Sequence, residues 1–353
     1  MSRHAWAWLR AAAAAAILGV LAWRLGTGAF TAGLRLIDGQ AVLAALGIGL
    51  VTTALSVGRW WLVARRLGLP LPLGTAMADY YQALFLNAVL PAGVLGDAHR
   101  AVRHGRRAGD VGRGVRAVVL ERAGGQVVFA VAGAAALAAD PSLARAVARD
   151  LAHGLGAAAA VLILAAAVAS AVAAWAWRGA IAVKLRGAFA VAVADMRTGL
   201  LSKDTWPGVL LLSAGALAGY LTLFLVAART AGATAPVGRL IPLMLLALLG
   251  MLLPVGIGGW GPREALAAVA FGTAGLGAEL GLTAAVTYGV LTFVAGLPGG
   301  LVLAARCLTR PAGRHDAPPG PPAAPPEPLV LAPRPLLAVR AAEHGQAVRE
   351  QFD

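Results

Sequence analysis

Long apolar runs with few charged residues divide this chain into segments that can cross a membrane. About 20 apolar residues in a helix span the roughly 30 Å hydrocarbon core of a bilayer. Short charged stretches separate the runs, so the pattern predicts an all-α polytopic membrane protein. About six full transmembrane helices are expected, at 5–23, 41–58, 117–139, 154–177, 205–228 and 280–305.

Two further apolar segments are interrupted by proline and glycine. One contains LPAGVLGDAHR at 90–100 and the other LPVGIGGWGPR at 253–263, so Leu, Pro, Gly, Gly and Arg coincide at one offset. Paired broken segments at equivalent places in two halves point to a membrane transporter's binding site. Non-helical backbone at membrane depth must be buried in protein or line a cavity. We therefore predict two Pro/Gly-broken re-entrant hairpins, at 80–96 and 240–278.

Each hairpin together with three helices forms one unit, and an odd number of helices inverts the second unit relative to the first. The chain is thus expected to hold a transmembrane domain at 1–310 built as an inverted repeat, with repeat 1 at about 1–139 and repeat 2 at about 154–306. Ten of the 20 prolines lie between 311 and 335. This composition predicts a Pro-rich disordered cytoplasmic tail at 311–353.

The charge distribution supports this topology. The chain is 59% hydrophobic and only 13% charged, whereas soluble domains are about 25% charged. Its net charge of +14 comes from Lys and Arg in short loops, which face the cytoplasm and place both termini there. Aromatic residues are not interleaved with the basic ones, so no nucleic-acid partner is expected. The densest predicted basic loop holds Arg100, Arg103, Arg106, Arg107, Arg113 and Arg116.

Five polar residues in the first half are candidates for function: Asn87, Asp97 and Arg100 in the first hairpin, and Glu121 and Arg122 in the third helix. Ionisable groups at membrane depth are costly and indicate function by default. Asp97 and Arg100, three residues apart, can alternatively pair with each other at a helix start. Glu121 and Arg122 are adjacent and point to different sides of a helix, so one is expected to have its partner in the other half.

The second hairpin offers a matching group. Arg263 and Glu264 follow Gly261 and a proline, and proline is favoured in the first turn of a helix. The free N–H groups and the dipole of such a helix start would attract an anion. Arg263 and Arg100 would then converge on a phosphate near mid-membrane. Trp260 has two interpretations, packing on a lipid headgroup or anchoring at the membrane interface.

Signatures of catalysis are missing from the sequence. It contains no GxxxxGK[ST], HExxH, CxxC or GxSxG motif, which are the patterns that would indicate common active sites. The six His residues show no metal-ligand spacing, and the single cysteine, Cys307, has no partner at such spacing. We therefore predict no enzyme activity, no metal and no other cofactor.

Three segments of the chain, at 87–100, 121–122 and 259–264, resemble segments of the flippase-like transmembrane family and follow the same order. This family is also described as the transmembrane region of lysylphosphatidylglycerol synthases. They are similar to the family's N-x-x-x-P-x-G-x-x-G-D-x-x-R segment, its Glu-Arg pair and its G-W-G-x-R-E segment, and they extend the resemblance over about 8–306. One departure is visible, since the family often carries an acid three or four positions after its Glu, where this chain has Gly124 and Gly125. The resemblance and the candidates above give one set of substrate-binding residues: Asn87, Pro91, Gly93, Gly96, Asp97, Arg100, Glu121, Arg122, Gly259, Trp260, Gly261, Arg263 and Glu264.

The resemblance implies a multi-pass protein of the bacterial inner membrane that translocates, or flips, an anionic lipid or a lipid-linked substrate of the polyprenyl-phosphate type. Membrane lipids would be its partners. One alternative is a non-transporting membrane partner that presents lipid to a glycosyltransferase or other lipid-modifying enzyme. Another is an intramembrane lipid transferase with Asp97 or Glu121 as base. The aminoacyl-transfer domain of the synthases is not expected, because the Pro-rich tail leaves no room for it.

Overall fold

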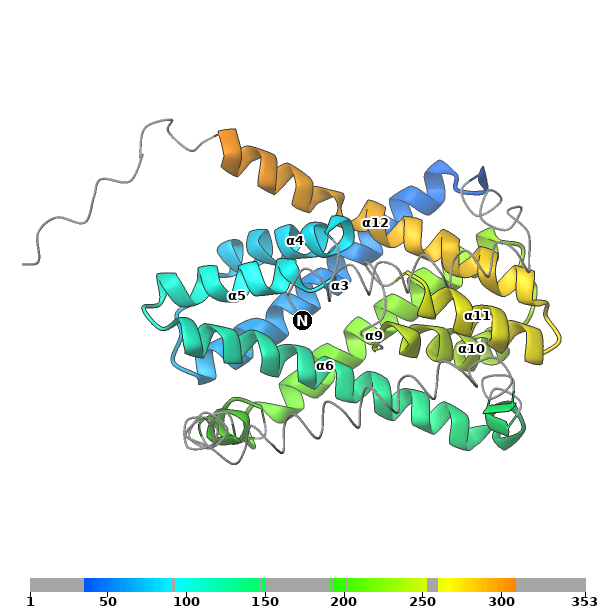
Figure 1. Ribbon diagram of the computed structural model, residues 1–353, viewed down its shortest axis with the longest axis horizontal. Helices are drawn as coiled ribbons and strands as arrows, with labels where there is room; N and C mark the ends of the chain where they lie inside the picture. The colour runs from blue at the N-terminus through cyan, green and yellow to red at the C-terminus, as the bar shows by residue number, and fades with distance from the viewer. Residues whose placement is uncertain are drawn as a thin grey trace, which may run out of the picture. The chain divides into compact units, whose positions relative to one another are not determined.

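The computed structural model describes residues 35–90, 93–145, 148–149, 191, 193–200, 202–252 and 260–308. All of them belong to one unit of the chain, Met1–Leu308. The first half contributes α3 (Gly39–Arg66), α4 (Leu73–Val89), α5 (Leu95–Arg107) and α6 (Val111–Ala139). The second half contributes α9 (Trp206–Thr230), α10 (Val237–Leu249), the short 3₁₀ helix η1 (Gly250–Leu252), α11 (Pro262–Thr273) and α12 (Ala278–Leu308) (Figure 1).

Four of these helices, α3, α6, α9 and α12, are long and apolar enough to cross a membrane. The prediction of an all-α polytopic membrane protein is thereby confirmed. α6 begins at Val111, six residues before the predicted start, because Asp110 caps it by accepting a hydrogen bond from the Arg113 backbone N–H at 2.8 Å. The predicted helices at 5–23 and 154–177 and the predicted tail at 311–353 lie outside the described residues.

The prediction of a basic loop after the first hairpin is wrong, because most of this segment forms the helix α5. Arginine is a good helix former, and the arginines of α5 find carboxylate partners on both neighbouring helices, α4 and α6. α5 ends at a turn in which Gly109 has a φ of 76°. α5 and α6 then approach closely, since a β-carbon on Gly114 would lie 2.6 Å from the α-carbon of Gly105.

The two halves show the same order of elements: a long helix, a short helix, a break, a short helix and a long helix. Their packing also corresponds. The last helix of each half packs against the short helix that precedes it and against the first short helix of the other half. Thus α6 contacts α5 and α10, while α12 contacts α11 and α4. The leading helices α3 and α9 pack against each other. The inverted repeat itself stays a prediction.

Two hydrophobic cores hold the helices together, and each draws residues from both halves. One core includes Trp60 and Val118 with Val209, and the other includes Phe224 with Ala45. In Figure 1, α4 and α5 lie on the left and α10 and α11 on the right, with α3 and α9 crossing between them. The hairpin formed by α4 and α5 and the hairpin formed by α10 and α11 therefore lie on opposite sides of the crossing helices α3 and α9. Their re-entry into the membrane stays a prediction.

Candidate functional site

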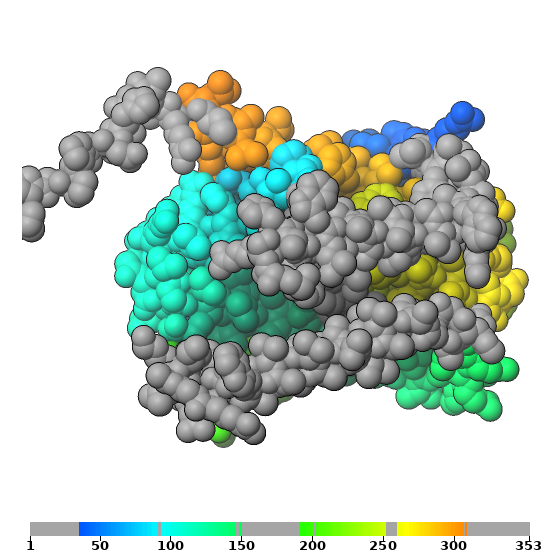
Figure 2. Space-filling model, in the orientation of Figure 1, coloured from blue at the N-terminus to red at the C-terminus, as the bar shows by residue number. Residues whose placement is uncertain are grey.

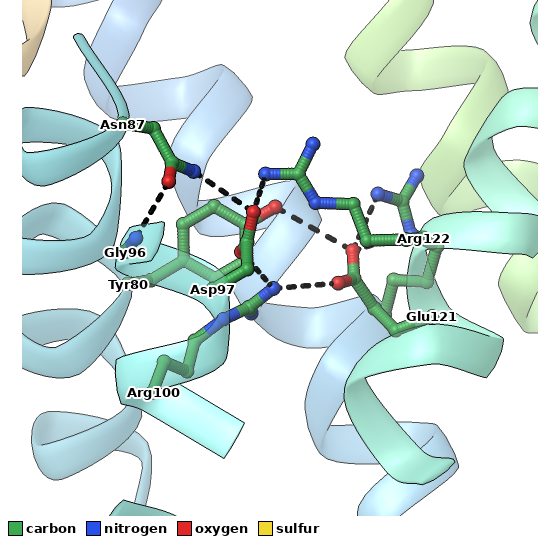
Figure 3. Close-up of polar contacts among 8 residues, drawn as sticks. Tyr80, Asn87, Gly96, Asp97, Arg100, Glu121 and Arg122 are labelled. Carbon is green, nitrogen blue, oxygen red and sulfur yellow. Dashed lines mark hydrogen bonds and ion pairs between the residues drawn. The ribbon is translucent and has the colours of Figure 1, made fainter. Parts of the chain in front are cut away.

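The polar candidates of the first half meet where the tip of the first hairpin lies against α6 (Figure 3). Asn87 comes from the end of α4, Asp97 and Arg100 from the first turns of α5, and Glu121 and Arg122 from α6. Glu121 stands about 15 Å along α6 from its first residue, which is about half the thickness of the hydrocarbon core.

Asn87 and Gly96 fix the geometry of the hairpin tip. The side-chain oxygen of Asn87 accepts a hydrogen bond from the Gly96 backbone N–H at 2.8 Å, and its amide nitrogen donates to Oδ2 of Asp97 at 2.8 Å. A β-carbon on Gly96 would lie 2.8 Å from the Cα and carbonyl carbon of Ala83, so only glycine fits this approach of α5 to α4. Gly93 has a φ of 60° at the turn itself, which favours glycine.

Asp97 receives two guanidinium groups. Nη2 of Arg100 donates to Oδ1 of Asp97 at 2.8 Å, and Arg122 pairs with Oδ2. The expected pairing of Asp97 with Arg100 is therefore present, although it is one part of a larger network. The Asn87 amide, which also donates to Oδ2, completes the pairing of this carboxylate.

Glu121 is fully buried and joins Arg100 to a residue that the sequence interpretation missed. Its Oε2 accepts from Nη2 of Arg100 at 3.0 Å, while its Oε1 accepts from Nε and Nη2 of Arg59 at 3.0 and 2.5 Å. The Tyr80 hydroxyl lies 3.5 Å from the same oxygen. Arg59 follows directly on the apolar run at 41–58 and precedes Trp60 and Trp61. An arginine inside an apolar stretch was the signal that could have identified it.

The expectation that Glu121 or Arg122 pairs with the other half is wrong for the described residues. The ion-pair partners of Glu121 and Arg122 come from α3 and α5, all in the first half. Contact with the second half runs through Arg59, whose Nη1 donates to the hydroxyl of Ser213 on α9 at 3.1 Å. Gly125 makes room for this arginine, because a β-carbon there would lie 2.8 Å from Nη1 of Arg59.

Aromatic rings enclose the Arg100 guanidinium. Its central carbon lies 4.6 Å from the ring centre of Trp60 and 4.2 Å from that of Tyr80. Such contacts stabilise a desolvated cation by about 2 kcal/mol. The rings thus contribute to holding Arg100 in a position from which solvent is excluded.

The network carries a surplus of positive charge. Three arginines, Arg59, Arg100 and Arg122, face two carboxylates, those of Asp97 and Glu121, which leaves one net positive charge. Nε and Nη1 of Arg100 and Nε of Arg122 are buried and have no hydrogen-bond partner among the described residues. The Arg122 side chain is 39% exposed, so it connects the buried network to the protein surface. This arrangement can accept an anion with several oxygens.

The second motif is arranged differently. Arg263 and Glu264 are both buried and pair with each other, and Oε2 of Glu264 accepts from the Gly261 backbone N–H at 2.7 Å. The expectation of a free helix start that attracts an external anion is therefore wrong, because the protein's own carboxylate occupies it. Trp260 packs 5.2 Å from the Arg263 guanidinium and Tyr288 at 5.1 Å.

Two predicted site residues, Pro91 and Gly259, lie outside the described residues. Arg100 pairs with Asp97 and Glu121, and Arg263 pairs with Glu264, so the convergence of the two arginines on one phosphate stays a prediction. In the described part of the chain, His, Cys, Asp and Glu form no group of three suited to a metal ion.

Comparison with known proteins gives one family. The family described as Lysylphosphatidylglycerol synthase TM region matches residues 7–300. A search of curated proteins finds no match.

Proposed function

The chain belongs to the lysylphosphatidylglycerol synthase transmembrane-region family, and from that premise we propose that it translocates an anionic lipid, or a lipid-linked substrate of the polyprenyl-phosphate type, across the bacterial inner membrane. The family indicates a lipid-related membrane function. The buried network around Arg100 supports the finer proposal, because it provides a site for the phosphate of a headgroup.

One observation carries the proposal: a buried network with a net positive charge and unpartnered guanidinium N–H groups. An unsatisfied buried donor costs about 1–3 kcal/mol, and more when it is charged. A phosphate that accepts hydrogen bonds from Arg100 and Arg122 would remove this cost and neutralise the surplus charge. Arg122, which is partly exposed, would make the first contact.

The connections of the network suit a rocking movement of one half against the other. Its ion pairs join α3, α5 and α6, so these three helices can move as one body. Its described hydrogen bond to the second half ends on the neutral hydroxyl of Ser213. Losing one such bond costs about 1.5–3 kcal/mol, whereas separating a buried ion pair costs about 3–5 kcal/mol. Transport by rocking would therefore leave the charged network intact.

The state of Asp97 supports transport over transferase chemistry. A general base must be free to accept a proton from the substrate, whereas the Asp97 carboxylate already accepts hydrogen bonds from Asn87, Arg100 and Arg122. Glu121 is held between two guanidinium groups. We accordingly propose that both carboxylates position arginines and that the protein is not an enzyme.

The purified full-length protein in vesicles tests the role of the network. The inward and outward movement of a fluorescent phosphatidylglycerol is followed for the unmodified protein, for Arg122→Gln and for Arg113→Gln. Arg113 is a matched control, because it lies on the same helix, is 45% exposed and pairs with Asp110. Loss of a charge-assisted contact predicts translocation about tenfold slower in Arg122→Gln.

Equal rates for Arg122→Gln and Arg113→Gln would contradict the assignment of the site. Absence of translocation together with co-purification of a lipid-modifying enzyme would favour the alternative, in which the protein presents lipid without moving it.

A further inference from the structure

A second cluster of arginines surrounds Asp79 on α4, outside the network described above. Nη1 of Arg107 lies 2.8 Å from Oδ2 of Asp79, and Nη1 of Arg306 lies 2.7 Å from Oδ1. Nε of Arg103 is 3.6 Å from Oδ1. Gln82, one turn further along α4, accepts hydrogen bonds from Arg103 at 3.4 Å and from Arg306.

Among the described residues, three guanidinium groups face one carboxylate in this cluster, which gives it an excess of positive charge. Its geometry directs the positive charge outwards. The Asp79 side chain is 1% exposed, whereas those of Arg103, Arg107 and Arg306 are 30%, 43% and 24% exposed. An anion that approaches the protein surface would therefore contact the guanidinium groups before the carboxylate.

The arginines come from both halves of the protein. Arg103 and Arg107 belong to α5, while Arg306 lies near the end of α12. Figure 2 shows the last turns of α12, in orange, beside the cyan surface of α4 and α5. Basic residues at helix ends mark the cytoplasmic side, so the sequence places this cluster at the cytoplasmic surface.

We propose that the Asp79 cluster is a second anion-binding site, which takes a phosphate monoester from a lipid headgroup or as free phosphate. A phosphate monoester carries close to two negative charges at neutral pH, which matches the excess of the cluster. Guanidinium groups bind phosphate oxygens in a bidentate fashion. Asp79 and Gln82 hold the arginines in place from the inside. The site goes beyond the proposed translocation and does not depend on it.

Binding to the purified full-length protein tests this proposal. Two probes separate the two sources of phosphate: inorganic phosphate in solution, and phosphatidic acid in mixed micelles with phosphatidylcholine as the comparison lipid. Affinity is measured by native mass spectrometry and by thermal stabilisation. The unmodified protein and the control Arg113→Gln are expected to bind at least one phosphate probe, and the variant Arg107→Gln/Arg306→Gln to bind it about tenfold or more weakly.

A third variant guards against misfolding. Adding Asp79→Asn to Arg107→Gln/Arg306→Gln removes the carboxylate that would otherwise be left buried with too few partners. This triple variant should fold and still bind the phosphate probe about tenfold more weakly. Binding that equals the Arg113→Gln control in both the double and the triple variant would overturn the proposal.

A further comparison separates this site from the central network. If Arg122→Gln abolishes phosphate binding and Arg107→Gln/Arg306→Gln leaves it unchanged, the phosphate belongs to the central network and the proposal is wrong. Weaker binding in the Asp79-cluster variants would support the second site even if the protein failed to translocate lipid.

Discussion

Arg100 and Arg263 stand at equivalent positions of the repeat, each between a tryptophan and a tyrosine ring. Their charge environments differ. Among the described residues, Glu264 is the carboxylate that neutralises Arg263, whereas Arg100 belongs to a network with a net positive charge. The repeated arginine therefore has a structural role in the second half and remains the candidate for anion binding in the first.

Glu121 is the residue on which the network depends for stability. Glu121→Gln removes the carboxylate that Arg59 and Arg100 share, and leaving a buried charge without its partner costs about 3–5 kcal/mol. We expect a much lower unfolding temperature in detergent. The control Glu279→Gln makes the same change at an exposed position of α12 and should alter stability by about 0.5 kcal/mol or less. Similar unfolding temperatures for the two variants would contradict this role.

The pKa of His104 allows a prediction of how the stability of the protein depends on pH. Burial lowers the pKa of His104, with opposition from Asp79 and reinforcement from Arg107 and Arg100. The unfolded chain therefore takes up a proton at His104 at a higher pH than the folded protein does, so stability falls as the pH drops below about 6.5.

This loss should be visible as a falling unfolding temperature between about pH 7 and pH 5. His104→Gln should make the fall shallower, while His99→Gln, at an exposed position of the same helix, should leave it unchanged. A slope that is the same in all three proteins would rule out His104 as its source.

At the scale of elements, the first hairpin depends on the close approach of α4 and α5. Gly96→Ala would drive a methyl group into the backbone of Ala83 and should cost about 1–3 kcal/mol through overpacking. Gly74→Ala, in α4, meets nothing within 4 Å and should be neutral or stabilising by up to about 1 kcal/mol. Thermal unfolding of both variants checks this. Equal stability would show that the tip tolerates a side chain.

The elements also show which features the sequence can and cannot predict. The length of the apolar runs was enough to predict α3, α9 and α12, because a helix needs about 20 apolar residues to span the hydrocarbon core. α5 was taken for a loop, because its charge hides a helix whose arginines are neutralised by carboxylates on other helices. Asp79 was missed because its partner Arg306 lies far away in sequence, and only the packed structure brings the two together. Arg59 was missed although its place in an apolar stretch marked it.

At the scale of the molecule, the inverted repeat predicted from the sequence can be tested through the membrane topology. In a Cys307→Ser background, which contains no other cysteine, Asp110→Cys should react with an impermeant thiol reagent from the cytoplasmic side. Glu279→Cys, at the start of α12, should react from the opposite side. Labelling of both positions from the same side would exclude the inverted arrangement.

Translocation itself is the central claim, and its most direct test is the transbilayer movement of lipids in vesicles that contain the purified full-length protein. The surplus positive charge of the Arg100 network predicts faster movement of phosphatidylglycerol than in protein-free vesicles, with a smaller effect on zwitterionic phosphatidylcholine. No acceleration of either lipid, or equal acceleration of both, would contradict the proposed function.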